Sequence, residues 1–310
     1  MEYQRVVFMG TPHFADEIFK TLLEENYNVV AAVTQPDKPT GRKKILTPSP
    51  VKETALAHGI SVLQPEKIRR EYKEVLDAKP DLIVTCAYGQ IVPKEILDVC
   101  LCINVHASLL PKYRGGAPMQ RSIMANEKET GITIMQMGVG MDDGDMISKS
   151  VVEITEEDTL GSLEEKLIES ACELLRETLK QLEREEACFT PQNSEEATFA
   201  RIIKKEEEKI DFQNGYETVY NHIRALIPSP CTYAYTAANQ KLKFCAIRKS
   251  DLTAEEENGM VLGLVDKAMG VAVDHRILLI DEVQPEGKSQ MKARDFMNGA
   301  GRKLIHTVLK

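Results

Sequence analysis

The stretch Leu101–Pro111 reads LCINVHASLLP, and it holds the features that decide both the fold and the chemistry. Its first six residues have the apolar and β-branched content of a buried strand. Because side chains alternate along a strand, Asn104 and His106 should share one face, with the intervening apolar residues on the other. The strand should end near Ala107, since residues 108–116 contain the proline and glycines of a loop. Polar side chains at the carboxyl end of a sheet strand lie where open α/β sheets bind ligands.

Similar apolar runs occur on both sides of this strand, and segments with helical spacing separate them. The expected strands are 5–9, 28–34, 81–87, 101–106, 131–137 and 146–154, and the expected helices are 14–25, 51–58, 66–78, 117–125 and 158–186. This alternation predicts an α/β fold with a mostly parallel sheet and helices on both faces.

A second domain is expected after a polar connection, because 310 residues exceed one typical core. Segment 188–209 has the composition of an exposed connection, and a helix at 216–226 follows it. Five strands are expected beyond that helix, at 232–236, 241–248, 259–266, 270–274 and 277–283. Such a set is able to close into a small OB-like β-barrel. We expect domains at 1–189 and 207–310, joined by a linker at 190–206.

Composition favours a soluble cytoplasmic protein. Hydrophobic residues make up 43% of the chain and charged residues 28%, as in ordinary globular proteins. No apolar run reaches eighteen residues, and the first residues lead directly into a strand-like segment without a signal-peptide pattern. The seven cysteines form no C-x-x-C pair, so we expect reduced thiols and no zinc site.

The distribution of charge leaves room for a nucleic-acid partner, although the net charge of -9 argues against one. Residues 1–203 carry a net charge of -10, and residues 204–310 carry +1. Segment 35–52, QPDKPTGRKKILTPSPVK, holds five positive charges and one negative. Its prolines and glycine exclude a regular helix or strand through its middle. Such a loop either neutralises phosphates or is a solvated basic loop.

Asn104, His106 and Asp142 form a set suited to acyl transfer. An amide donor stabilises an oxyanion, an imidazole donates or moves a proton, and a carboxylate orients the imidazole or accepts a proton from an amine. No serine or cysteine stands in a nucleophile elbow, which favours direct transfer between two bound substrates. The alternative for His106 is a hydrogen-bonded core histidine. Chemistry alone leaves Asp143 and Asp145 as alternatives to Asp142.

The longer string 104–120, NVHASLLPKYRGGAPMQ, closely resembles the signature of 10-formyltetrahydrofolate-dependent formyltransferases. The resemblance continues at 87–93 (AYGQIVP), 131–137 (GITIMQM) and 140–146 (GMDDGDM). Two blocks near the start, FMGTPHFA at 8–15 and TQPDKP at 34–39, narrow it to the methionyl-tRNA formyltransferase family. The resemblance implies a Rossmann-like formyltransferase domain followed by an OB-like tRNA-binding domain.

The same resemblance implies a reaction and a site. The formyl group of 10-formyltetrahydrofolate would pass to the α-amine of methionyl-initiator tRNA, for translation initiation. The family places its aspartate 38 residues after the asparagine, which selects Asp142 for the catalytic set with Asn104 and His106. The residues implied for folate binding are Tyr88, Gly89, Gln90, Ile91, Ser108, Leu109, Leu110 and Pro111. Those implied for tRNA binding are Lys38, Arg42, Lys43 and Lys44, in the basic segment.

Other interpretations remain open at this point. One is a formyltransferase for a small amine, such as a nucleotide sugar or glycinamide ribonucleotide, and another is a folate- or RNA-binding protein without catalysis.

The acidic stretch 142–145 lacks the spacing of an EF-hand, so no metal is expected. Gly10–Pro12 is interpreted as a tight turn near the substrates, with Thr11 a candidate helix cap. Four basic residues of the second domain either face tRNA phosphates or discourage edge pairing, namely Lys241, Lys243, Arg248 and Lys249. Ser229 stands where the family usually has an aromatic residue. We expect a monomer.

Overall fold

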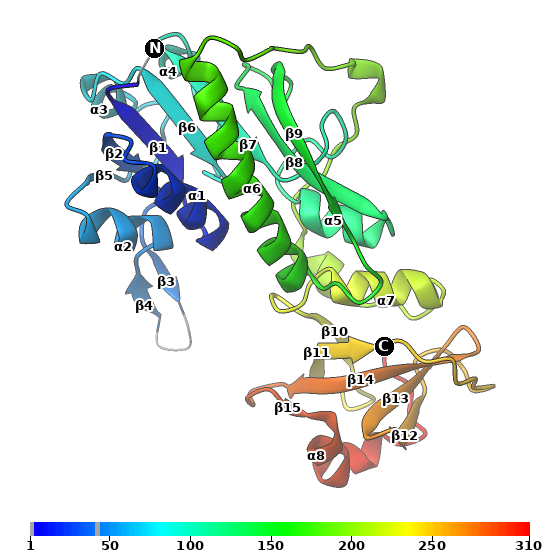
Figure 1. Cartoon of the computed structure of the whole chain (residues 1–310). Helices are drawn as coiled ribbons and strands as arrows, with labels where there is room; N and C mark the ends of the chain where they lie inside the picture. Colours follow the sequence, from blue (N-terminus) through cyan, green and yellow to red (C-terminus); the bar gives the residue numbers. More distant parts are fainter. Residues whose placement is uncertain (1–2, 41–43) are drawn as a thin grey trace. The chain divides into compact units, whose positions relative to one another are not determined.

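The computed structural model describes residues 3–40 and 44–310 (Figure 1). The chain divides into two compact units. The first comprises the chain up to Pro118 together with Glu129–Glu153 and Glu164–Arg201, and the second comprises Met119–Lys128, Ile154–Leu163 and Ile202–Lys310. Among the described residues, no helix combines the length and the apolar character that crossing a membrane requires.

The first unit is built on a seven-stranded sheet with the order β5-β2-β1-β6-β7-β8-β9. Its strands are β1 (Val6–Gly10), β2 (Val29–Val33), β5 (Ser61–Leu63), β6 (Leu82–Cys86), β7 (Leu101–His106), β8 (Glu129–Gln136) and β9 (Met146–Glu153). The first five strands in that order pair in parallel, whereas β8 and β9 are antiparallel. The predicted mostly parallel sheet is therefore confirmed.

Helices cover both faces of the parallel part, which explains why every residue of β1 and β6 is buried and why all of them except Thr85 are apolar or glycine. On one face α1 (His13–Glu24) stacks Phe19 on Phe8 of β1, with ring centroids 5.0 Å apart. On the other face Val7 and Met9 share a cluster with residues of α3 (Lys73–Asp77) and α4 (Lys94–Leu97). The first unit also contains α2 (Pro50–Ala57) and most of α6 (Leu160–Glu183), which hydrogen-bonds β9 through Ser148–Thr178 and Ser150–Ser170. Nearly all of α5 (Pro118–Met124) belongs to the second unit.

The helix expected at 66–78 is confined to Lys73–Asp77. At its expected start, the Ile68 amide donates to Gln90 Oε1 at 2.9 Å rather than to the preceding turn of a helix. In the basic segment, β3 (Lys38–Thr40) and β4 (Ile45–Thr47) pair as a short antiparallel ribbon on either side of the middle of the segment. A two-stranded ribbon is all edge, where a residue such as Pro39 is tolerated.

The second unit contains α7 (Tyr216–Arg224) and an antiparallel sheet with the order β10-β11-β14-β13-β12. Its strands are β10 (Thr232–Tyr235), β11 (Lys241–Arg248), β12 (Val261–Val265), β13 (Ala268–Val273) and β14 (Arg276–Pro285), with β15 (Met291–Lys292) pairing β14. These match the five strands predicted for the OB-like domain. Phe244, Val271 and Ile280 lie in its core with Tyr216 of α7. The short α8 (Ala293–Asn298) was not predicted, because six residues give too little periodicity to recognise.

Candidate active site

Strand β7 carries Asn104 and His106 at its carboxyl end, as the sequence predicts. Asn104 is paired in register with Thr85 of β6 on one side and with Met135 of β8 on the other. The hydroxyl of Thr85, a residue only 2% exposed, donates to Asn104 Oδ1 at 2.8 Å. Because the amide oxygen takes this bond, the NH₂ group is the part of Asn104 that can donate to a substrate oxygen.

Both nitrogens of His106 face polar partners. Nε2 lies 3.0 Å from the backbone carbonyl of Tyr113, and a carbonyl only accepts, so Nε2 is protonated and donates. Nδ1 lies 3.7 Å from Asp142 Oδ2. Nδ1 is therefore the nitrogen at which this imidazole can accept or release a proton during a reaction.

Asp142 is held by the loop that follows β7. Its Oδ2 accepts the backbone N–H of Gly115 at 2.8 Å, and its backbone has a left-handed φ of 48°. The structure thus brings the carboxylate beside the imidazole of His106, across a separation of 36 residues in the sequence. The side chains of Asp142 and His106 are 20% and 6% exposed, so the pair lies in a partly desolvated position.

The neighbouring aspartates have other surroundings. The carboxylate oxygens of Asp143 lie against Gly138 and Gly140 of the same loop, where a Cβ at either glycine would collide with them. The backbone carbonyl of Asp145 accepts the amide of Gln136 at 2.8 Å. Of the three carboxylates, Asp142 is the one for which a contact with His106 is observed, at 3.7 Å from Nδ1.

The loop Ser108–Pro111, implied for folate binding, is fixed by the neighbouring strands. Thr133 of β8 is fully buried, and its hydroxyl donates to the Ser108 carbonyl at 2.7 Å while accepting the Leu110 amide at 3.1 Å. The ammonium of Lys149 in β9 donates to the Leu110 carbonyl, and burial lowers the pKa of this lysine. The peptide bond between Leu110 and Pro111 is cis. This loop is thus anchored at two of its carbonyls and one amide.

The second segment implied for folate binding, Tyr88–Ile91, follows β6. The side chain of Tyr88 is buried, while its carbonyl accepts from Thr11 Oγ1 at 3.1 Å and Gln35 Nε2 at 3.2 Å. Gly89 has a left-handed φ of 86° and Ile91 is 57% exposed. Thr11 does not cap α1, since Pro12 occupies the cap position and provides no side-chain hydrogen bond. Thr11 instead ties the turn after β1 to the segment after β6.

Two of the four residues implied for tRNA binding are described. Lys38 lies in β3 and Lys44 is exposed beside β4, whereas Arg42 and Lys43 lie outside the described residues. Ile45 and Leu46 of β4 are 63% and 65% exposed. Lys52, the remaining cation of the segment, is paired with Asp37 at 2.7 Å, so its charge is neutralised within the segment itself.

The four basic residues singled out in the second unit are engaged within that unit. Lys241 lies 3.8 Å from the centre of the Tyr233 ring, and Lys243 donates to the Pro230 carbonyl at 2.7 Å. Arg248 pairs with Asp266 and Asp281, and Lys249 pairs with Glu156 and Glu217. These contacts favour a structural role for all four.

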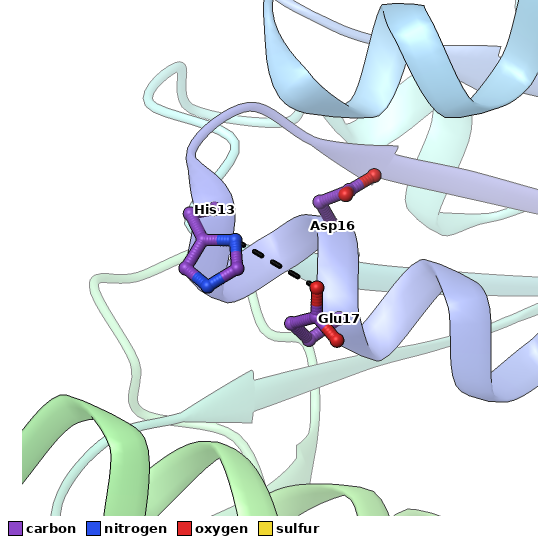
Figure 2. A group of neighbouring side chains, drawn as sticks. All are labelled: His13, Asp16 and Glu17. Carbon is purple, nitrogen blue, oxygen red and sulfur yellow. Dashed lines mark ion pairs between the residues drawn. The ribbon is translucent and has the colours of Figure 1, made fainter.

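A possible metal-binding group lies on the first turn of α1 (Figure 2). His13 Nδ1 and Glu17 Oε1 lie 3.7 Å apart, and Asp16 offers a carboxylate oxygen within 4.8 Å of both. Lys20 lies 2.8 Å from both carboxylates, and these hydrogen bonds raise the pKa of its ammonium. A cation is already present, and the positive end of the helix dipole disfavours a second. We assign no metal to this group.

Three residues that contact the site were missed by the sequence analysis. Thr85 and Thr133 lie opposite Asn104 and His106 in the strand register, which sequence patterns do not reveal. Gln192 lies in the segment expected to be a linker, yet its side chain bonds the backbone of Asp142. The only sequence signal for Gln192 was its position beside Pro191 in an otherwise acidic stretch.

Comparisons with known proteins show which family the sequence resembles. The family profile "Formyl transferase" matches residues 4–179, and "Formyl transferase, C-terminal domain" matches residues 202–301. A methionyl-tRNA formyltransferase of Bacillus subtilis is 50% identical over 301 residues, which are 96% of this chain and 95% of the relative. One from a Geobacillus species is 48% identical over 97% of this chain and 96% of its own length.

Solved structures share the fold at low sequence identity. HypX from Aquifex aeolicus, solved with tetrahydrofolic acid, matches with a TM-score of 0.71 and 15% identity over 99% of this chain. The match covers 49% of HypX, so this chain spans about half its length. An N-formyltransferase of Helicobacter canadensis, solved with folinic acid and dTDP-3-aminofucose, matches with a TM-score of 0.66 and 18% identity, covering 91% of this chain and 99% of that one.

Proposed function

The chain belongs to the formyl transferase family, among the methionyl-tRNA formyltransferases, and from this premise we propose that it formylates the α-amine of methionyl-initiator tRNA. The formyl donor is 10-formyltetrahydrofolate, and the product is N-formylmethionyl-tRNA for translation initiation. The observation that carries this function is the sequence similarity to a methionyl-tRNA formyltransferase, which is 50% identical over 96% of this chain. The chain also contains Asn104, His106 and Asp142.

The reaction is an acyl transfer between two bound substrates. The amine nitrogen forms a bond to the formyl carbon, whose carbonyl oxygen gains negative charge in the tetrahedral intermediate. The bond from that carbon to N10 of the folate then breaks, and N10 takes a proton as tetrahydrofolate leaves. The amine gives up one proton, so the site must supply an oxyanion donor and a route for protons.

Asn104 fits the role of oxyanion donor. Its carbonyl oxygen is occupied by the Thr85 hydroxyl at 2.8 Å, which favours presenting the NH₂ group to the substrate. A donor fixed before the reaction stabilises developing charge without reorganising during it. The protein supplies this orientation from a neighbouring strand.

His106 and Asp142 fit the proton route. With Nε2 donating to the Tyr113 carbonyl, Nδ1 is the atom that receives or delivers a proton, and Asp142 lies 3.7 Å from it. The carboxylate stabilises the imidazolium by opposite charge and accepts the proton of the attacking amine, directly or through water.

The folate is proposed to bind between the two anchored segments at the carboxyl end of the sheet, Tyr88–Ile91 and Ser108–Pro111. Support comes from their fixed backbones and from the two structural relatives solved with folates. Open α/β sheets bind their ligands at this edge. The tRNA is proposed to contact the basic residues Lys38, Arg42, Lys43 and Lys44.

We also propose which part of the chain carries each function. Residues 1–189 form the catalytic domain and residues 207–310 the tRNA-binding domain, joined by 190–206. The protein is proposed to act as a monomer in the cytoplasm, without a metal. Equilibrium sedimentation of the full chain tests the monomer, and an activity unaffected by chelators tests the independence from metal.

A formyl-transfer assay tests the function. The chain is given 10-formyltetrahydrofolate with charged initiator methionyl-tRNA in one reaction, and with a nucleotide sugar amine or glycinamide ribonucleotide in parallel reactions. Formylation of the tRNA alone is expected. Formylation of only a small amine contradicts the tRNA assignment, and no transfer to any acceptor supports a binding protein without catalysis.

A further inference from the structure

The segment Thr190–Ala200 joins the two loops that hold the catalytic set. Thr190 exchanges two backbone hydrogen bonds of 2.8 Å with Met146, at the end of the loop that carries Asp142. Arg114, in the loop after β7, donates its amide to the Thr198 carbonyl at 2.8 Å and accepts the Ala200 amide at 2.7 Å. The segment therefore runs from one loop to the other within the first unit.

Between these anchors, the Gln192 side chain makes four hydrogen bonds. Its Oε1 accepts from Arg114 Nε at 3.0 Å and from Nη2 at 2.7 Å. Its Nε2 donates to the carbonyls of Asp142 and Gly144, both at 2.8 Å. Two donors and two acceptors satisfy a side-chain amide fully, so its orientation is fixed. Arg114 is itself buried, and its guanidinium needs this acceptor.

The residues that Gln192 connects lie directly beside the contacts of the catalytic pair. Tyr113, which precedes Arg114, accepts from His106, and Gly115, which follows it, donates to Asp142. The other end of the bridge is the carbonyl of Asp142 itself. A residue with a left-handed φ, as Asp142 has, keeps it only where the surroundings impose it. Gln192 supplies such a constraint.

We propose that Gln192 is a positioning residue, which sets the approach of Asp142 to His106 by locking the loop at 142–144 to the loop at 113–115. Gln192 makes none of its four bonds to a catalytic side chain, so it acts through Asp142. The effect on catalysis rests on the proposed function. The effect on the geometry does not.

The substitution Gln192→Glu separates the two sides of the bridge. A glutamate keeps the acceptor oxygens for Arg114, and replaces the NH₂ group by an oxygen that faces two carbonyls. The carbonyls of Asp142 and Gly144 lose their hydrogen bonds and are repelled by the new carboxylate oxygen. Arg114, in contrast, keeps an acceptor for its guanidinium. Asn193→Ala is the matched control, because it removes the exposed side chain that caps Ser194–Glu196 in the same segment and touches none of the four bonds of Gln192.

Turnover at saturating substrates should fall at least tenfold in Gln192→Glu, with both Michaelis constants within about twofold of wild type, because the change acts through a catalytic side chain. Asn193→Ala should match wild type. In an Asp142→Asn background, Gln192→Glu should cause little further loss, since the residue through which it acts is already disabled. A purely structural role would predict a further loss of about the same factor in both backgrounds.

A second measurement does not depend on activity. The ¹⁵N resonances of the His106 imidazole should move in Gln192→Glu and stay in place in Asn193→Ala. If Gln192→Glu does not fold, Gln192→Met, which removes the hydrogen bonds to both loops, is compared with Asn193→Ala in the same assays. Wild-type turnover in the variant, additive losses in the double variant or unmoved His106 resonances would each overturn the positioning role. A wild-type chain that fails to formylate tRNA refutes the proposed function instead, and leaves the resonance test of Gln192 in force.

Discussion

The charge of Asp142 can be removed without removing its shape, by the substitution Asp142→Asn. In the wild-type chain the Gly115 amide donates to Asp142 Oδ2 at 2.8 Å. The side-chain carbonyl of an asparagine can still accept this hydrogen bond, so the loop should keep its position. The change then isolates the electrostatic contribution of the carboxylate to the reaction.

The magnitude follows from the geometry. Opposite unit charges about 4 Å apart, close to the observed 3.7 Å between Nδ1 and Oδ2, attract by about 4 kcal/mol at an effective dielectric constant of about 20. The two side chains are largely buried, so water screens this attraction little. If the imidazolium forms in the transition state, losing about 4 kcal/mol there lowers the rate roughly 1,000-fold.

Single-turnover formyl transfer at saturating 10-formyltetrahydrofolate and methionyl-tRNA measures this step directly. Asp143→Asn is the matched control, because its carboxylate lies against Gly138 and Gly140 of its own loop and should contribute little to turnover. Thermal unfolding of both variants checks that each is folded. A rate for Asp142→Asn within tenfold of wild type, or an equal loss in Asp143→Asn, would refute the reasoning.

Three further predictions concern other parts of the chain. Replacing Arg42 and Lys43 by alanine should raise the Michaelis constant for tRNA and flatten its salt dependence while folate affinity is unchanged, and unaltered tRNA kinetics would remove the basic segment from the account. Thr133→Val removes a buried hydroxyl that holds the loop after β7, so the Michaelis constant for the folate should rise several-fold and stability should fall by about 1–3 kcal/mol in denaturant titrations. The guanidinium of Arg121 holds the pKa of Glu207 below its ordinary value, so this stabilising contribution is present above the ordinary pKa and is lost as the pH falls through the folded-state pKa. Glu207→Gln should therefore flatten the acid side of the stability curve, below about pH 5, in thermal melts taken across pH.

Much of the fold was predicted from local patterns. The β7 and β11 boundaries agree with their expected ranges, and the other expected strands agree within one or two residues at most ends. Parallel strands covered on both faces read as continuous apolar runs, and such runs are easily recognised. The helix expected at 66–78 failed over its first part, because a side chain distant in sequence, Gln90, takes the backbone donor at Ile68.

The sequence predicted which types of residue form the candidate site, but it predicted only some of the contacts between them. Asn104 and His106 could be placed on one face from alternation alone, whereas selecting Asp142 among three aspartates needed the family spacing. The roles of these residues in catalysis, and those of the folate and tRNA segments, stay predictions for the experiments above. The four basic residues of the second unit show what sequence patterns cannot predict. The sequence gives their charge, but it does not show that an aromatic ring, a carbonyl and several carboxylates already contact them.

The sequence by itself determined the order and kind of most of the longer strands and helices, the two-part organisation and the chemistry available at the end of β7. These depend on properties that repeat or alternate over a few neighbouring residues, so they can be recognised locally. Only the tertiary structure decided which nitrogen of His106 faces Asp142, which group orients Asn104 and that Gln192 ties the two loops together. Each of these depends on hydrogen bonds between segments distant along the chain, and such pairings are fixed by strand register and by the closure of loops rather than by any local pattern.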